Sequence, residues 1–167
     1  DSNFFDFFSF ILLEGNVKTA LKEPNSMVLT PATARRYFGD ESAMGKVITV
    51  GSSNEAYTVT GIAEAAPSNS HIKFDMLLSM ASEEAAKEAD WGNTNGTYTY
   101  FRKDRHTALA SVTSGLQKMV KKFIHPEIEE SFGMSFQEFE KQGNEYVFFS
   151  YALSDSHLYH PEITDGL

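Results

Sequence analysis

Apolar residues recur along the chain with two different periods, and these periods predict both helices and strands. Phenylalanines at 4, 5, 7 and 8 and the isoleucine at 11 fall on one face of a short helix. The longest helix is predicted over 107–124 from the spacing of its core positions: Leu109, Val112, Leu116, Met119, Val120 and Phe123. Further helices are predicted over 32–38, 82–89 and 133–141. Strands are predicted over 27–29, 46–50, 57–63, 72–80, 97–103 and 146–153.

Local signals define the ends of the helix over 32–38. Thr30 is a suitable N-cap and Pro31 suits the first helical position. Gly39 follows the last apolar residue, where a left-handed glycine cap is common. The polar stretch 51–54 then joins two predicted strands as a hairpin.

The order of these elements predicts an α+β fold, a mixed sheet with helices packed on one face. At 167 residues the chain fits one domain, with two small lobes as the alternative arrangement. The polar loops 67–70 and 91–96 are the candidate lobe boundaries, and no internal repeat is apparent.

Composition removes several classes of protein. The absence of cysteine excludes a disulfide scaffold, a thiolate zinc site and a cysteine nucleophile. A net charge of −9 argues against a nucleic-acid partner, whose binding proteins carry basic patches. The most apolar stretch, 4–13, is about half the length of a membrane-spanning helix. The chain starts without Met, so we expect it to be a piece of a longer protein.

The negative charge is concentrated near the C-terminal end of the chain. Residues 127–167 hold nine acidic side chains and one basic side chain, Lys141. A docking surface for a basic partner would explain this segment, but a solvated helical face explains it more simply. The lysines at 118, 121 and 122 are accounted for by the dipole of the helix that ends there.

Candidate chemistry is sparse. Gly39 to Lys46 resembles a phosphate loop, but five residues separate its glycines and Val47 follows the lysine. His157 and His160 are candidate metal ligands, yet no further ligand on a defined element completes a site. The run Ser154 to His157 has the residue types of a serine triad without the elbow motif. We therefore predict no catalytic residues and no cofactor.

Several short motifs, taken in order, resemble one family. They include the Phe-rich start with Leu12 to Gly15, the run Ala34 to Glu41, and Ser70 to Asp75. Together they resemble the periplasmic core domain of FtsX-like, MacB-type ABC transporter permeases, in the form common in Bacteroidetes. The resemblance covers about 1–80 well, 145–160 thinly and 81–144 not at all. The motif positions are Phe4, Phe5, Gly15, Thr30, Phe38, Gly39, Gly45, Lys46, Gly61, His71 and Phe74.

The chain departs from the family at a few points. Ile11 and Ala43 stand where members usually have proline, and both changes affect turns rather than chemistry. The segment that contributes the family's first strand or strands is not part of this sequence. An unpaired sheet edge is therefore expected, and such an edge can pair with a second copy.

The resemblance implies a function without catalysis. The domain would be a lever and docking surface that carries ATP-driven motion of transmembrane helices across the bacterial inner membrane, with this segment in the periplasm. The implied partners are a cytoplasmic ATPase subunit and a second permease copy in a dimer. The output would be a periplasmic adaptor, a cell-wall hydrolase or an exported substrate, among which the sequence does not choose.

Two other hypotheses remain open. One is a periplasmic binding module without a transport role, whose ligand cleft would be lined by the Phe-rich start or by Trp91, Tyr98 and Tyr100. The other is a metal-dependent enzyme that uses His157 and His160.

Overall fold

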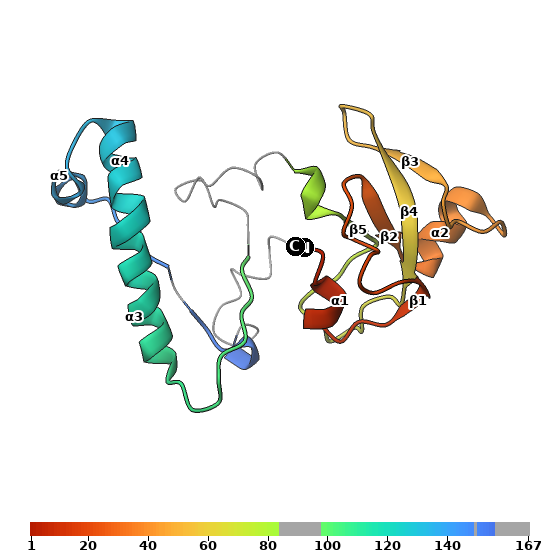
Figure 1. Ribbon diagram of the computed structural model, residues 1–167, viewed down its shortest axis with the longest axis horizontal. Helices are drawn as coiled ribbons and strands as arrows, with labels where there is room; N and C mark the ends of the chain where they lie inside the picture. The colour runs from red at the N-terminus through yellow and green to blue at the C-terminus, as the bar shows by residue number, and fades with distance from the viewer. Residues whose placement is uncertain (84–97, 149, 156–167) are drawn as a thin grey trace. The chain divides into compact units, whose positions relative to one another are not determined.

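The computed structural model describes residues 1–83, 98–148 and 150–155 (Figure 1). The chain divides into two compact units, the first reaching residue 89 and the second beginning at residue 90. We call the described residues 1–83 the first unit and those from 98 to 155 the second unit. The loop 67–70 lies within the first unit, and the candidate boundary at 91–96 lies outside the described residues.

The first unit is built on a mixed sheet, as the sequence predicted, and this sheet has five strands. Its strands are β1 (Leu12–Gly15), β2 (Ser26–Leu29), β3 (Val47–Val50), β4 (Glu55–Ala63) and β5 (Met76–Leu78). The long strand β4 is central: it pairs with β2 in parallel and with both β1 and β3 antiparallel. Strand β5 pairs antiparallel with the other side of β2. The α+β class is therefore confirmed.

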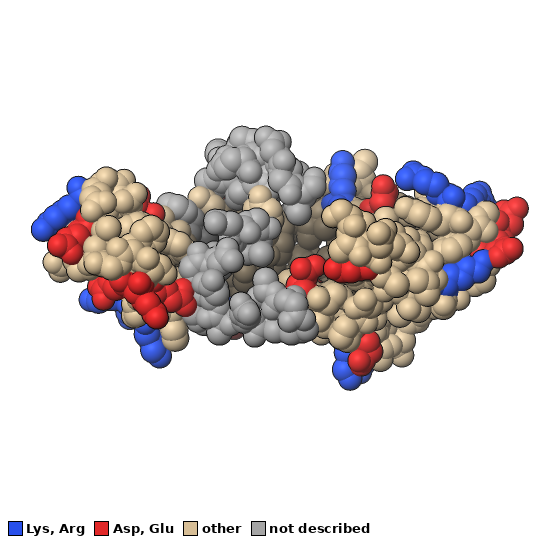
Figure 2. Space-filling model, turned by 90° about the horizontal axis from the view of Figure 1, so that it is seen from above, with Lys and Arg blue, Asp and Glu red and all other residues tan. Residues whose placement is uncertain are grey.

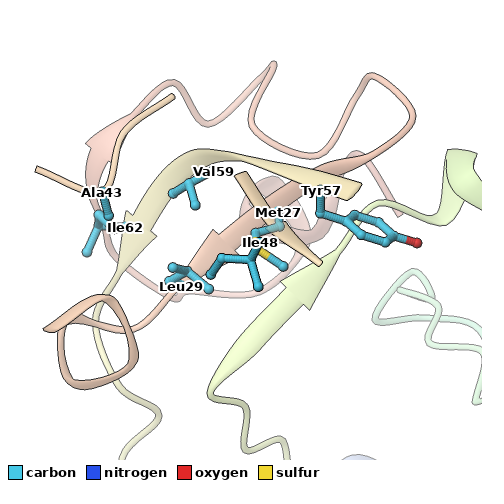
Figure 3. Close-up of a cluster of buried hydrophobic side chains, with 7 residues drawn as sticks. All are labelled: Met27, Leu29, Ala43, Ile48, Tyr57, Val59 and Ile62. Carbon is cyan, nitrogen blue, oxygen red and sulfur yellow. The ribbon is translucent and has the colours of Figure 1, made fainter. Parts of the chain in front are cut away.

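The two faces of this sheet have separate hydrophobic cores, because neighbouring residues of a strand point to opposite faces. On one face Met27, Leu29 and Val59 pack against helix α2 (Pro31–Phe38), and Figure 3 shows this cluster. On the other face Val28 packs against Phe5 of the short helix α1 (Phe4–Phe7). The sequence predicted that all helices pack on one face of the sheet. Helix α2 packs on one face, but α1 packs on the opposite face.

The predicted start of α2 is confirmed. The Thr30 hydroxyl accepts a hydrogen bond from the Thr33 N–H, and Pro31 stands at the first helical position. The helix ends at Gly39, as expected, but with φ of 63° and ψ of −128° rather than in the left-handed helical conformation. Glycine adopts this backbone conformation readily and other residues do so at a cost.

The second unit consists mostly of helix. Helix α3 (Leu109–Met119) continues through a π-helical turn, η3 (Val120–Ile124), into α4 (His125–Phe132) without a break (Figure 1). Helix α5 (Phe136–Lys141) follows, and a single 3₁₀ turn, η4 (Leu153–Asp155), lies near the end of the described chain. The buried core is formed by Val120, Ile124, Ile128 and Phe136.

Pro126 explains the wide turn between α3 and α4. Proline cannot donate to the carbonyl four residues earlier, and its ring crowds that carbonyl. The His125 N–H instead donates to the Val120 carbonyl, one residue further back than in an α-helix. The helical stretch therefore passes Pro126 and runs to Phe132, eight residues beyond the predicted end at 124.

Other predicted elements differ from the structure. The first helix ends at Phe7, before Ile11, which is 56% exposed. The strand predicted over 72–80 is reduced to β5, followed by a 3₁₀ turn, η1 (Met80–Ser82). Ser79, not Ser82, caps that turn, and residues 84–89 of the predicted helix lie outside the described residues.

The strands predicted over 97–103 and 146–153 are wrong for the residues that the structure describes there. Tyr146 and Phe148 pack on the helical core of the second unit instead. The alternating aromatic residues thus pack on a helix surface. They do not form a strand, because no neighbouring strand pairs with them in the described residues. Within the described parts of the chain, no helix is both long and apolar enough to cross a membrane.

Candidate functional site

The Phe-rich start of the chain forms an aromatic cluster on one face of the first unit. The Phe4 ring stacks on Phe10, with centroids 5.4 Å apart and planes at 8°. Phe74, from the segment before β5, meets both rings edge-on, at 5.9 Å from Phe4 and 5.2 Å from Phe10. Edge-to-face pairs of this kind add about 0.5–1.5 kcal/mol each beyond their buried area. Residues 4–10, here called the N-terminal segment, are thereby held to a distant part of the chain.

Phe5 fixes the same segment to the sheet itself. Its side chain is 7% exposed and belongs to the cluster that contains Ala20, Leu21, Val28 and Ala63. Val28 and Ala63 belong to β2 and β4, so one side chain of α1 contacts the two central strands. The motif residues Phe4, Phe5 and Phe74 thus come together in space.

A small open pocket of about 210 Å³ adjoins this cluster. Its lining comes from two segments: Phe8, Ser9, Phe10, Pro67, Ser70, His71 and Ile72. The lining is mainly apolar, and the Ser70 hydroxyl is engaged with the backbone of Ile72, donating to its carbonyl at 2.7 Å. The motif residue His71 is half-buried here. The pocket could accept one apolar side chain or a short hydrocarbon group.

Other motif residues gather beside α2. The Lys46 ammonium lies 4.9 Å from the centre of the Phe38 ring and forms an ion pair with Glu41. The hydrogen bond from Lys46 lowers the pKa of the Glu41 carboxyl, and its charge adds to this effect. The Gly45 N–H donates to the Val59 carbonyl at 2.8 Å. These contacts hold the loop after α2 against β4 and indicate a structural role.

Gly15 and Gly61 face each other across β1 and β4. Gly15 has a φ of +100°, and a Cβ atom there would lie 2.5 Å from the Thr60 carbonyl oxygen. A Cβ on Gly61 would lie 3.0 Å from the Leu12 side chain. Both motif glycines therefore permit a close approach of the two strands.

Sequence reasoning missed two of the residues that hold the first unit together. Asn25 has a φ of +57°, and its side-chain amide donates to the Ala56 carbonyl at 3.0 Å. Thr60 lies at a bulge between β2 and β4, and its hydroxyl donates to the Ala20 carbonyl at 2.6 Å. The Pro-Asn-Ser turn before β2 was a signal for Asn25, and Gly61 inside β4 was a signal for the bulge at Thr60.

Part of the acidic segment has a local role in the second unit. Glu138 and Ser135 form a capping box at the start of α5, and the Ser135 side chain lowers the pKa of the Glu138 carboxyl. A Glu129 carboxylate oxygen accepts from the Phe136 N–H at 3.2 Å. Such carboxylates satisfy N–H groups that a helix start leaves open. They favour the interpretation of this segment as a solvated helical face over that of a docking surface.

The candidates for the other two hypotheses are scattered. His157, His160 and Trp91 lie outside the described residues. Tyr98 and Tyr100 belong to the second unit, where burial, and to a lesser extent Tyr98, raises the pKa of Tyr100. Within the ranges that the structure describes, no three His, Asp or Glu side chains are placed to hold a metal ion. The N-terminal segment and its pocket are therefore the best-defined candidate site.

The N-terminal segment and its pocket lie within the part of the chain that a family model matches. The family model for the MacB-like periplasmic core domain matches residues 1–119. None of the curated proteins matches the chain.

Two solved structures are similar to the chain. The first is a domain of a protein assigned as a permease from Porphyromonas gingivalis, with a TM-score of 0.57 and 26% identity over 73% of this chain. The second is the periplasmic region of MacB from Actinobacillus actinomycetemcomitans, with a TM-score of 0.43 and 10% identity over 88% of this chain. The chain spans 56% and 64% of their lengths. The family match shows that the chain belongs to the MacB-like periplasmic core domain family, a periplasmic domain of ABC-type permeases.

Proposed function

We propose that this domain is a non-catalytic lever that relays ATP-driven movement of transmembrane helices to periplasmic molecules. The observation that carries the proposal is the way the N-terminal segment is fixed to the sheet. Phe5 is buried against β2 and β4, and Phe4 and Phe10 pack on Phe74. A close-packed interior transmits strain with little compression. A displacement applied to the N-terminal segment should therefore move the sheet with it.

The strand order supports the same path. Strand β1 follows the N-terminal segment directly and pairs with β4, which also pairs with β2 and β3. Force that enters at β1 is thus shared by the hydrogen bonds of the longest strand. A lever requires this connection more than it requires any reactive side chain.

We also propose the other components of the transporter, and this part of the proposal rests on family membership. It consists of a cytoplasmic ATPase subunit and a second permease copy, in the bacterial inner membrane, with this domain in the periplasm. The moved molecule would be a periplasmic adaptor, a hydrolase or an exported substrate.

The test uses the full-length permease with its ATPase subunit in vesicles. The 167 residues hold no cysteine, so a single Lys22→Cys change places a spin label on an exposed position of the first unit. We expect the label-to-label distance between two copies to shift when ATP is added. A double variant, Phe4→Ala with Phe10→Ala, should reduce this shift while ATP hydrolysis continues.

The matched control is Tyr37→Ala, which removes a ring that is 52% exposed on the same unit. It should leave the distance shift unchanged. A distance that is the same with and without ATP would contradict the lever.

A second candidate function is favoured by the pocket beside Phe8 and Phe10. A binding module would use it for an apolar group, and a ligand that binds only the folded state raises the melting temperature. A thermal-shift screen of fatty acids and short apolar peptides tests this. Stabilisation that disappears in Ile72→Asp would support binding, and no stabilisation by either class would exclude it.

A further inference from the structure

The loop before α3 carries a group of exposed basic and aromatic side chains. Within residues 98–106, here called the basic loop, Arg102, Lys103 and Arg105 are exposed and Asp104 is the one acidic residue. Tyr98 is 40% exposed and Phe101 is 45% exposed. We infer that the basic loop is a surface that binds the anionic head groups of a lipid bilayer.

The loop has a defined shape. The Asp104 carboxylate accepts from the His106 N–H at 2.8 Å, and the Lys103 ammonium donates to the Thr107 carbonyl at 3.0 Å. The only acid of the loop is thus turned toward its backbone. Phe101 and Arg105 remain exposed on this turn.

Helix stability does not account for these positive charges. Bases stabilise a helix near its C-terminal end and are unfavourable near its N-terminal end, which is where α3 begins. Arg35 and Arg36 are a useful contrast, because they occupy the last turn of α2, where the helix dipole favours them. The helix that follows the basic loop therefore does not explain the positive charge of the loop.

Charge is segregated along the second unit. The helical stretch from Leu109 to Phe132 is about 36 Å long at 1.5 Å per residue. The basic loop precedes its start, whereas Glu129, Glu130, Glu138 and Glu140 belong to its far end or to α5. Figure 2 shows acidic side chains gathered on the part of this unit that carries α4 and α5. A negatively charged surface would attract one end of the unit and repel the other.

The aromatic residues select a bilayer over an acidic protein. Tyrosine and phenylalanine beside cationic side chains are typical of segments that lie at the boundary between head groups and hydrocarbon. Basic residues near an anionic bilayer each contribute about 1 kcal/mol of attraction. A partner that binds through charge alone would gain nothing from an exposed Phe101.

The test measures binding of the 167-residue chain to vesicles by sedimentation. Vesicles of phosphatidylglycerol mixed with phosphatidylcholine are compared with phosphatidylcholine alone. We expect binding to the anionic vesicles only, and loss of that binding at 1 M salt, where the screening length is about 3 Å. Arg105→Glu should lower partitioning about 25-fold, since each charge is worth about fivefold and the reversal changes it by two. Phe101→Ser should also weaken binding.

The matched controls are Arg36→Glu, which makes the same charge reversal, and Tyr37→Ser, which also replaces an exposed aromatic ring by serine, both on α2. These variants should bind as the unchanged chain does. Equal binding to neutral and anionic vesicles, or equal loss in the control pair, would overturn the inference. Binding to soluble polyglutamate that Phe101→Ser leaves unchanged would also overturn it, in favour of an acidic protein partner. None of these outcomes depends on the lever proposal.

Discussion

The side chain of Phe5 lies among Val28, Ala63, Ala20 and Leu21 and is almost entirely removed from water. It is the one buried residue of α1. Its neighbours Phe4, Phe7 and Phe8 are only half-buried, and Phe4 also packs on Phe10 and Phe74. At the scale of single residues, the connection between the N-terminal segment and the sheet therefore depends most on Phe5.

We expect Phe5→Ala to lower the free energy of unfolding by about 3–5 kcal/mol, because it leaves a cavity at the junction of two strands. Urea unfolding followed by circular dichroism measures this change. Tyr37→Ala, at a 52% exposed position, should change the same quantity by less than about 0.5 kcal/mol. Similar losses in the two variants would show that Phe5 is not a core residue.

Gly15→Ala tests the close approach of β1 to β4. The new methyl group would lie 2.5 Å from a backbone oxygen, at a φ of +100°. We expect a loss of about 3 kcal/mol or more, from backbone strain together with overpacking. Gly39→Ala provides the comparison, because its φ is +63° but nothing lies within 4 Å of the added atom. That variant should lose about 1–2 kcal/mol, and equal losses would contradict the contact at Gly15.

Among the helices and strands, those specified by neighbouring residues were predicted correctly, and those that need a distant partner were predicted less well. Thr30, Pro31 and Gly39 act on their own helix, so the N-cap, the first helical position and the end of α2 were all predicted correctly. The hairpin of β3 and β4 followed from a polar turn between two apolar runs. The strand predicted over 146–153 failed because a strand also needs a partner, and Tyr146 and Phe148 found a helical core instead. The wide turn before Pro126 was missed because periodicity does not distinguish it from an ordinary helix end.

In the candidate site, too, local features were predictable from the sequence and long-range contacts were not. The helical spacing of the N-terminal phenylalanines was visible in the sequence, but Phe10 and Phe74 join the cluster only through the fold. The pocket between that segment and residues 67–72 could not be predicted, since it depends on two loops meeting.

Glu138 provides a test of the capping box at the start of α5. Its hydrogen bonds from Ser135 lower the pKa of its carboxyl below the usual 4.5. The bonds therefore stabilise the second unit above the ordinary carboxyl pKa, and this contribution is lost as the pH falls through the lowered value. Carbon NMR titration should show Glu138 titrating below 4.5, and Ser135→Ala should return it toward the ordinary value. A Glu138 that titrates normally in the unchanged chain would contradict the box.

Gly115 tests whether the stability of α3 is reduced by a residue of low helix propensity. It lies inside the helix, has an ordinary φ, and has open space around it. We expect Gly115→Ala to stabilise the second unit by about 1 kcal/mol, the usual difference between these residues in a helix. Thermal unfolding followed at 222 nm measures the change, and a lower melting temperature would indicate that Gly115 has a packing role.

In the whole molecule, the two units contribute different properties to the proposed lever. The first unit supplies a sheet with buried clusters on both faces. The second unit supplies a long helical stretch, with the basic loop before it and acidic side chains at its far end. The net charge of −9 does not show this contrast, because the two charged regions differ in sign.

If the N-terminal segment and the sheet move as one body, the distance between them within one copy is the quantity to measure. Spin labels at Ser2→Cys and Thr49→Cys, both exposed, would mark the start of the chain and strand β3 of the same copy. Labelled copies are diluted with unlabelled ones in full-length permease with its ATPase. We expect this distance within one copy to stay the same when ATP is added, while the distance between copies changes. A distance within one copy that shifts with ATP, and a constant distance between copies, would contradict the lever.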